Sequence, residues 1–330
     1  MKIKPITKFA ILALSLVLVA CAGGGSEEAG CPAIDGREIN VVATTPMIGE
    51  FVSQVGGENI NLTVLMPPEA NPHTYEPAPQ DAGTIAEADL VFYTGLLYEP
   101  AALVKLLENS ACSTDILSEV GESVFPIEFK EGGHDDHDDH DDEEGHDDHE
   151  GHNHGAYDPH FWFDPSRVAY AAEYIESRLI QFDPENESSY TSSADSFVSE
   201  LNDLTKQVSE LISTVPSQNR KLITTHESLG YLEAKFGLEV LSTIIPSLNS
   251  ANEISPSDLA GVIDVIEDNN VKVIFIESEA PSVYSETIVA ETGIKPVTGL
   301  YVETLKPGQS YSEFLISNVT LITENLQDTD

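Results

Sequence analysis

The sequence predicts an α/β protein of two lobes, each with a mainly parallel sheet flanked by helices, joined by one long rigid helix. Short apolar runs alternate with helical patterns in two blocks, 38–117 and 220–326. Such alternation is the signature of βαβ units built around a parallel sheet. Between the blocks, an amphipathic stretch of roughly 31 residues ends at Thr214 and spans about 46 Å as a helix. A helix of that length can bridge two domains.

Each expected strand is a short apolar run, and each expected helix shows helical periodicity. In the first block, strands are expected at 39–45, 60–66 and 90–95, with helices at 47–56, 80–88 and 100–108. In the second block, strands are expected at 220–226, 238–242, 271–278 and 294–301, with helices at 229–237, 257–268, 283–293 and 310–326. Both blocks therefore predict parallel strands with helices as connections.

Two helices are expected between the blocks. The first covers Ser166 to Leu179. The second is expected to begin with Asp183 as its N-cap and Pro184 at its first position, which are residues favoured at those places. Its apolar residues recur at steps of three, four or seven, which predicts one continuous apolar face. Because strand–helix alternation resumes directly afterwards, a bridge between two domains is favoured over a helical hairpin within one domain.

The N-terminus has the features of an export signal. Three lysines in the first eight residues precede an apolar run at 9–20, which is too short for a membrane span of roughly 20 residues. The sequence LVAC at 18–21 resembles a lipobox, so we expect Cys21 to become the lipidated first residue. The alternative is an ordinary signal peptide cut near Ala20. Either way, the protein is expected outside the cytoplasm, and the lipid would hold it on the outer face of the cell membrane.

The mature length exceeds one typical domain. The expected organisation is a signal peptide at 1–20, a lipidated tether at 21–36, an N-terminal lobe at 37–182 with a disordered His/Asp-rich loop at 131–156, a linking helix at 183–215 and a C-terminal lobe at 216–330. Export places Cys31 and Cys112 in an oxidising setting, so a disulfide between them is one expectation. Two separate thiols are the alternative.

The net charge of −42 limits the possible partners. Residues 131–154 contain twelve acidic and no basic residues, which leaves a charge of about −30 for the rest of the chain. A chain this acidic repels nucleic acid and anionic lipid, and it concentrates cations nearby.

Three of the ten histidines stand apart from a cluster of seven. His73 in NPHTYEP and His226 in TTHESLG follow expected strands, where α/β folds place ligand groups. His160 in DPHFWFDP lies between prolines 159 and 165, which favour a non-helical loop. A lone loop histidine is more often solvated than a ligand, but three in such places indicate one metal site. Three imidazoles and one oxygen form a tetrahedral zinc site.

The fourth position of such a site requires an oxygen ligand. Glu303 in GLYVETL is the candidate, because it too lies just past an expected strand. Glu227 and Glu277 are competitors, and Glu277 lies near the end of the strand expected at 271–278. Taken singly, each of these acids is more often a solvated or capping residue.

Seven histidines alternate with acidic residues in one low-complexity run. They are His134, His137, His140, His146, His149, His152 and His154. Spacings of mostly three residues provide many weak sites but no fixed geometry, so we expect an auxiliary zinc collector or sensor. The alternative is a solvated acidic linker. Since only neutral imidazole binds metal, capture should weaken as the pH falls through about 6.5.

Five segments occur in the order NPHTYEP, DPHFWFDP, THESLGYLEAKFGL, VKVIFIES and GLYVETLKPG. In these segments, and over essentially its whole mature length, the chain resembles the zinc- and manganese-binding receptors of ABC importers. The resemblance implies two α/β lobes, a rigid connecting helix and one metal in the cleft between the lobes. It also implies that His73 and His160 are ligands from the first lobe, and that His226 and Glu303 are ligands from the second.

The resemblance also bears on the choice of metal. Many members of the family carry aspartate where this chain has Glu303, so the alternatives are that the longer Glu303 side chain reaches the metal or that a water takes the fourth position. Histidine at the third ligand, His226, points to the zinc branch, whereas a carboxylate there would point to manganese. Imidazole suits zinc, while manganese prefers oxygen and higher coordination. Zn²⁺ is therefore the expected cargo, and Mn²⁺ or another divalent metal is the runner-up.

Together these features predict a monomeric, lipid-anchored receptor, not an enzyme, that delivers zinc to an ABC permease. The chain has no GxxxxGKS or GxxxxGKT motif, so a separate ATPase would supply the energy. The long helix is expected to limit lobe closure. A zinc hydrolase is a remote alternative, because HESLG begins like HExxH but has Gly230 instead of the second histidine. A surface adhesin or metal buffer would need the histidine run but not the four cleft residues.

Overall fold

The computed structural model of the chain describes residues 31, 34, 36–129, 157–249, 252–279 and 283–327. The described part belongs to one compact unit that begins at Cys31. The expected signal peptide, the lipidated Cys21, most of the tether and the histidine run lie outside the described residues, so these expectations stay predictions. Among the residues that are described, no helix has both the length and the apolar character needed to cross a membrane.

The first lobe is built on a parallel sheet with the strand order β2-β1-β3-β4. Its strands are β1 (Ile39–Ala43), β2 (Ile60–Val64), β3 (Leu90–Tyr93) and β4 (Leu117–Glu119), and its helices are α1 (Pro46–Gly56), α2 (Pro79–Ala86) and α3 (Ala101–Ser110). Thr45 caps α1 by accepting a hydrogen bond from the Ile48 backbone N–H. The sequence predicts every one of these elements except β4, whose three residues are too few to show a period.

The second lobe repeats the same order, as β6-β5-β7-β8, again with parallel strands. Its strands are β5 (Lys221–His226), β6 (Glu239–Ile245), β7 (Val273–Glu277) and β8 (Lys295–Leu300), and its helices are α6 (Gly230–Phe236), α7 (Pro256–Asn269), α8 (Val283–Thr292) and α9 (Tyr311–Gln327). The expected two-lobed α/β fold is confirmed. In a parallel sheet the carboxyl ends of the strands share one edge, and this edge is where ligand groups gather.

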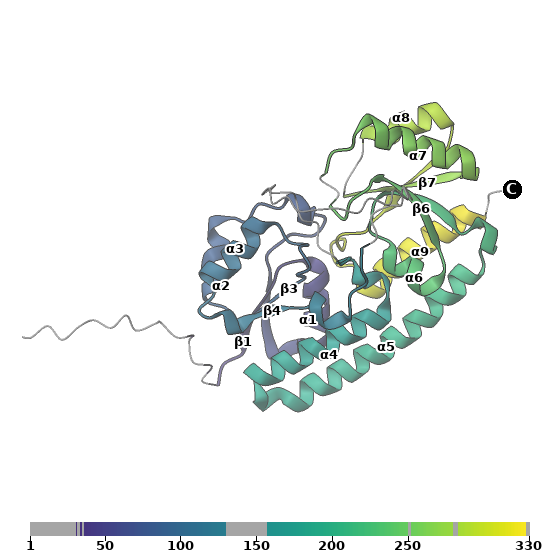
Figure 1. Cartoon of the computed structure of the whole chain (residues 1–330). Coiled ribbons are helices and arrows are strands. Elements are labelled where there is room, and N and C mark those ends of the chain that lie inside the picture. Colours follow the sequence, from purple (N-terminus) through teal and green to yellow (C-terminus); the bar gives the residue numbers. More distant parts are fainter. Residues whose placement is uncertain are drawn as a thin grey trace, which may run out of the picture. The chain divides into compact units, whose positions relative to one another are not determined.

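Two long helices, α4 (Pro165–Phe182) and α5 (Glu187–Ser213), lie side by side, and α5 runs along both lobes (Figure 1). The predicted start at Asp183 corresponds to a short 3₁₀ turn, Pro184–Asn186, with Asp183 at its N-cap position and Pro184 at its first position, and α5 follows this turn directly. The Asp183 side chain makes no capping bond in this turn; its carboxylate accepts hydrogen bonds from the Tyr190 hydroxyl and the Asn186 side chain. With 27 residues, α5 is about 40 Å long. It packs against α1 of the first lobe and α9 of the second.

The two faces of each sheet are packed differently. One face of both sheets contributes to a single apolar cluster with α1, α4, α5 and α9, which we call the inner core. The other face of the first sheet packs under α2 and α3, and that of the second sheet under α7 and α8; these are the two outer cores. In β1, for example, Val41 belongs to the inner core and Val42 to the outer one, as the two-residue period of a strand requires. The lobes therefore share one core and each keep a second one.

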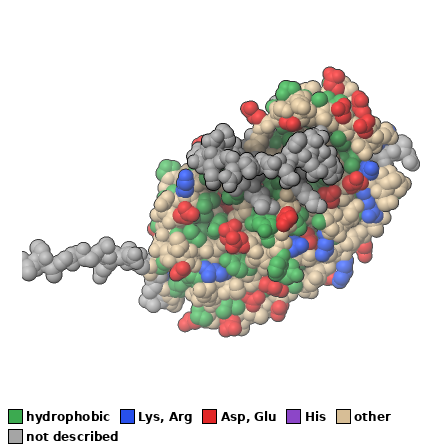
Figure 2. Space-filling model, viewed as in Figure 1, with side chains coloured by type: hydrophobic (Ala, Val, Ile, Leu, Met, Phe, Trp, Pro, Cys, Tyr) green, Lys and Arg blue, Asp and Glu red, His purple; other side chains and the backbone are tan. Residues whose placement is uncertain are grey.

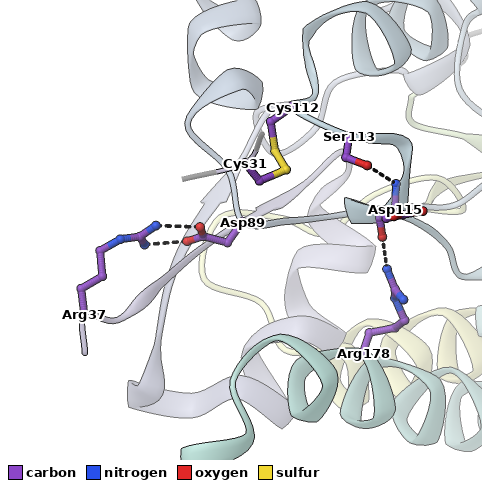
Figure 3. Close-up of a disulfide and its surroundings, with 7 residues drawn as sticks. All are labelled: Cys31, Arg37, Asp89, Cys112, Ser113, Asp115 and Arg178. Atoms are coloured by element: carbon purple, nitrogen blue, oxygen red, sulfur yellow. Dashed lines mark hydrogen bonds and ion pairs between the residues drawn. A yellow bond between two sulfur atoms is a disulfide. The ribbon is translucent and has the colours of Figure 1, made fainter. Parts of the chain in front are cut away.

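A disulfide joins Cys31 to Cys112, just beyond the end of α3 (Figure 3). It fastens the start of the described chain to the first lobe. Nearby, the Arg37 guanidinium donates two hydrogen bonds of 2.6 Å to the Asp89 carboxylate, and the Asn40 backbone N–H donates to the same group. These bonds hold the segment that leads into β1 against the segment that leads into β3.

The surface carries the acidic excess expected from the composition. On the face shown in Figure 2, acidic side chains are scattered among few basic ones. Such a surface attracts cations towards the protein without fixing them at one place.

Candidate metal centre

Four side chains from four separate segments meet between the lobes. They are His73, His160, His226 and Glu303, and one ligand atom from each lies within 4.8 Å of the others. The side chains of His160, His226 and Glu303 are fully buried, and that of His73 exposes only 3% of its surface. The structure thus brings together the same four residues that the sequence offers.

His73 is carried by the loop that follows β2. The residue lies in a short 3₁₀ turn, Pro72–Thr74, and its backbone N–H donates to the Asn71 side chain (2.9 Å). Its Nε2 atom lies 3.0 Å from Oε1 of Glu303. Its ring packs edge-to-face with Tyr98, with 5.2 Å between the ring centroids. Among the described residues, no carboxylate bonds to the other ring nitrogen of His73, so packing and the turn orient its ring.

His160 immediately precedes the turn Phe161–Phe163 that leads into α4. Asp158, two residues earlier, pairs with both the backbone N–H (2.9 Å) and the ring Nδ1 (2.8 Å) of His160. That pairing leaves Nε2 free to face Glu303, whose Oε2 lies 3.4 Å away. A carboxylate on the distal nitrogen fixes the orientation of a ligand histidine and raises its basicity.

His226 is the last residue of β5, and Glu277 is the last residue of the neighbouring strand β7. The Glu277 carboxylate pairs with the ring Nδ1 of His226 and accepts from its backbone N–H. The Nε2 atom of His226 then lies 2.9 Å from Oε1 of Glu303. The same arrangement of imidazole and carboxylate therefore occurs at both buried histidines.

Glu303 lies three residues beyond β8, on a loop fixed from two sides. Oε1 of Glu279 accepts hydrogen bonds from the backbone N–H groups of Val302 and Glu303 (3.0 and 3.2 Å). The Tyr98 hydroxyl donates to Oε2 of Glu303 at 2.9 Å. Since Oε2 is engaged by Tyr98, Oε1 is the oxygen that Glu303 presents to His73 and His226.

The two competing acids have other partners. Glu277 holds the distal nitrogen of His226, so it orients a histidine of the cluster without joining the cluster. Glu227 accepts a hydrogen bond from the Thr243 hydroxyl (3.1 Å), and burial raises the pKa of its carboxyl to about 7. Of the three acids that the sequence offers, the structure places Glu303 in the cluster.

The buried carboxylates control the protonation of the imidazoles. Burial lowers the pKa of His160, but Asp158 and Glu303 outweigh burial and raise it to about 9. Burial likewise lowers the pKa of His226, and Glu277 and Glu303 raise it well above its ordinary value. For Glu303 burial raises the pKa, but the charges on the three histidines hold it well below its usual range. In the metal-free protein, protons on His160 and His226 therefore balance the neighbouring carboxylates, and a bound cation would replace these protons.

Two atoms of the cluster have no hydrogen-bond partner among the described residues. Nε2 of His160 and Nε2 of His226 are buried, and Glu303 lies close to both without the geometry of a hydrogen bond. Buried polar atoms normally have a partner, so an unpaired one indicates a missing group. Three imidazole nitrogens and a carboxylate oxygen around one point form a donor set for a four-coordinate divalent metal. The residues present therefore fit a metal cargo.

The HESLG segment does not form a metalloprotease site. In HExxH both histidines lie on one helix, whereas His226 here ends a strand and Gly230 begins α6. A Cβ atom on Gly230 would lie only 2.7 Å from Oδ2 of Asp158. A side chain at this position would therefore displace the Asp158 carboxylate that pairs with His160.

Of the residues that orient the ligands, Asp158 has a signal in the sequence, because it stands two residues before His160 in the DPH motif. Tyr98 and Glu279 come from distant segments, and nothing in their neighbourhood in the sequence links them to Glu303. Only the folded chain brings them to that side chain.

The fold and the cluster together define a two-lobed α/β metal-binding protein whose site is built from both lobes. A family model described as "Zinc-uptake complex component A periplasmic" matches residues 41–325, and the chain belongs to this family. Members are metal-binding receptors of ABC importers rather than enzymes, which confirms the family expected from the sequence.

Individual relatives cover nearly the whole chain. The chain is 29% identical over 328 residues to the "High-affinity zinc uptake system protein ZnuA" of Bacillus subtilis, with 96% of each chain covered. It is 23% identical over 324 residues to the "Manganese-binding lipoprotein MntA" of Halalkalibacterium halodurans, with 96% of this chain and 97% of the relative covered. The solved periplasmic zinc-binding protein TroA from Treponema pallidum has the same fold, with a TM-score of 0.74, 22% identity, and 88% of this chain and 99% of that chain covered. The names of the relatives include both zinc and manganese.

Proposed function

We propose that the protein is a lipid-anchored receptor that captures Zn²⁺ outside the cytoplasm and delivers it to an ABC permease driven by a separate ATPase. The observation that carries this proposal is the buried cluster of His73, His160, His226 and Glu303. Three of its four donor atoms are imidazole nitrogens, for which zinc has a stronger preference than manganese. The zinc-uptake relative in Bacillus subtilis supports the same choice, and the manganese-binding relatives make Mn²⁺ the alternative cargo.

The hydrogen bond from Tyr98 adds a second argument for zinc. Tyr98 donates to Oε2 of Glu303. Oε1, in contrast, has no hydroxyl partner among the described residues and faces His73 and His226, so we take Oε1 as the ligand atom. The cluster then supplies four donor atoms, which suits tetrahedral zinc. Manganese prefers more oxygen ligands and a higher coordination number, and a carboxylate free to bind through both oxygens would favour it.

The remaining parts of the proposal concern residues outside the described structure. Lipidation at Cys21 would place a short tether between the membrane and the disulfide at Cys31. The histidine run at 134–154 would collect zinc near the cleft, and relatives named as lipoproteins support the anchored location. The lobe boundaries expected at 182 and 215, and the monomeric state, belong to the proposal as well.

The proposal is tested by titrating the chain from residue 22 onwards with zinc and with manganese in a calorimeter. A second protein lacks residues 131–154, and a third carries His226→Ala. We expect one tight zinc site that persists without the histidine run and is weakened by at least about 100-fold in His226→Ala. Loss of tight binding on removal of the run would favour a surface metal buffer. A preference for manganese would keep the receptor role but change its cargo.

A further inference from the structure

The four residues of the cluster are attached to the lobes in different ways. His226 and Glu303 belong to the second lobe, at the end of β5 and beyond β8. His73 belongs to the first lobe, after β2. His160 lies on residues 158–162, which we call the strap, and the strap lies between the two sheets in the sequence. The attachment of the strap therefore decides how the site divides when the lobes move.

Three hydrogen bonds fasten the strap to the second lobe. The Tyr231 hydroxyl of α6 donates to the Asp158 carbonyl (2.8 Å). The indole N–H of Trp162 donates to the carbonyl of Val302 (2.8 Å), the residue before Glu303. The Tyr311 hydroxyl at the start of α9 donates to the Trp162 carbonyl (2.7 Å). All three bonds are buried, so water does not compete with them.

The strap meets the first lobe mainly through apolar contacts. The Trp162 ring packs on Tyr98, with 5.3 Å between centroids, and Phe161 packs on Phe51 at 6.2 Å. One backbone bond joins Asp158 to the carbonyl of Ile127 (3.0 Å). Apolar contacts are non-directional and tolerate small shifts, whereas a hydrogen bond weakens steeply when its geometry changes. On separation of the lobes, the strap should therefore stay with the second lobe.

The loop that carries His73 is fastened to the first lobe. The backbone N–H groups of Leu65 and Met66 donate to carbonyls at the end of β1, at 2.9 and 3.0 Å. The Tyr75 hydroxyl bonds to the Leu65 carbonyl (3.2 Å) and to Asp81 in α2 (3.1 Å). From this loop to the second lobe, the Asn71 side chain reaches the Glu279 carbonyl at 3.5 Å, the limit of a hydrogen bond.

We propose that the site divides three to one: His160, His226 and Glu303 stay together on the second lobe, and His73 is the single ligand that the first lobe adds and withdraws. This inference rests on the proposed function, because it takes all four residues as ligands. Trp162, Tyr231 and Tyr311 then act as positioning residues that keep His160 with the second lobe. An opened receptor would still hold the cargo by three ligands, with the fourth position accessible to water.

This division gives each step of transport a defined ligand change. Three ligands and an open position are the arrangement that lets zinc exchange a ligand readily. Capture would begin on the second lobe and end when His73 closes the coordination sphere. Release would begin with the loss of His73, together with the bond from Tyr98 to Glu303. A small displacement of the first lobe is enough for this, which agrees with the shared inner core.

The first test compares His73→Ala with His160→Ala in the mature chain. Zinc affinity is measured in competition with a chelator strong enough to strip the histidine run. In His73→Ala the three remaining ligands share one lobe, whereas in His160→Ala they are divided between lobes and must be brought together. We expect His73→Ala to keep one site, and His160→Ala to bind at least about tenfold more weakly than His73→Ala, because its ligands are less preorganised. With Co²⁺ as the probe, His73→Ala should give the weaker visible absorption of a site that has gained water.

The second test leaves all four ligands in place. Tyr311→Phe removes one bond between the strap and the second lobe, and Tyr190→Phe removes a buried hydroxyl bond of equal length, 2.7 Å, between α5 and Asp183. Zinc release into excess chelator is followed by stopped flow. We expect release from Tyr311→Phe to be roughly three- to tenfold faster than from Tyr190→Phe, as the loss of one hydrogen bond implies. Equal thermal unfolding temperatures would exclude a general loss of stability as the cause.

The outcomes separate this inference from the proposed function. Equal weakening by His73→Ala and His160→Ala would overturn the three-to-one division and leave the four-ligand site intact. Unchanged zinc affinity in both variants would overturn the four-ligand site itself. Release from Tyr311→Phe no faster than from Tyr190→Phe would show that the strap bonds do not hold His160 in place.

Discussion

The inner core of this protein is shared by both lobes, whereas each outer core belongs to one lobe. The inner core joins both sheets to α1, α4, α5 and α9, and α5 links the lobes by packing against α1 of the first and α9 of the second. Each outer core serves one lobe alone, under α2 and α3 or under α7 and α8. Close packing resists deformation, so the lobes cannot separate widely without breaking the inner core. The comparison indicates that small movements at the strand ends, rather than a wide hinge, control access to the cluster.

A substitution at Phe51, in the inner core, should have the largest effect on both stability and zinc binding. Its ring contacts Tyr311 of α9, Phe197 of α5 and Phe161 of the strap, at centroid distances of 5.2 to 6.3 Å. We expect Phe51→Ala to lower the free energy of unfolding by about 3–5 kcal/mol. It should also weaken zinc binding, because it loosens the helices that support both lobes. Chemical denaturation and zinc titration of the same variant would measure both effects.

Leu107 in α3 provides the matched control, since it is equally buried but belongs to the outer core of the first lobe. Leu107→Ala should cost about 2–5 kcal/mol of stability and leave zinc affinity within roughly threefold of the wild-type value. If Leu107→Ala weakened zinc binding as strongly as Phe51→Ala, the distinction between inner and outer cores would have no functional meaning.

The disulfide allows a test confined to the first lobe. Cys31 and Cys112 are separated by 81 residues, so their bond restricts a long loop of the unfolded chain. We expect Cys112→Ser to lower the free energy of unfolding by about 2–4 kcal/mol without changing zinc affinity, because the bond lies beyond α3 and away from the cluster. Denaturation with and without reductant would show whether the wild-type protein responds in the same way. A loss of zinc affinity would contradict this expectation and would mean that the disulfide also stabilises the metal centre.

The last prediction concerns the protons of the cluster. Because the pKa of His160 is raised from 6.5 to about 9, protonated His160 stabilises the metal-free protein fully below pH 6.5, and this contribution is lost as the pH rises through 9. In the proposed function, zinc would take the place of that proton. The stabilisation by zinc should therefore grow between pH 6.5 and 9, by at most about 1.4 kcal/mol per pH unit for each proton released. Thermal unfolding with and without zinc at several pH values measures it, and a constant difference would contradict the expectation.

The sequence determined the elements of this protein and the residues of its cluster. Strand and helix periods are local, so the βα alternation placed seven of the eight strands in the described part of the chain, and the long amphipathic stretch indicated α5. His73, His160, His226 and Glu303 all follow strands or lie in rigid loops, where parallel sheets bring ligands together. Local patterns were less informative at short elements, which is why β4 was missed and why the 3₁₀ turn at Pro184–Asn186 was not distinguished from the start of α5.

Only the tertiary structure decided how those residues act together. Glu227, Glu277 and Glu303 are equivalent acids near strand ends in the sequence, and their roles separate only through their neighbours: Thr243, His226 and the histidine cluster. The attachment of the strap was also decided by tertiary contacts. The resemblance placed His160 of the strap in the first lobe, but three buried hydrogen bonds join the strap to the second lobe. These contacts join residues from 73 to 149 positions apart, and no periodic pattern in the sequence records a pairing over that distance.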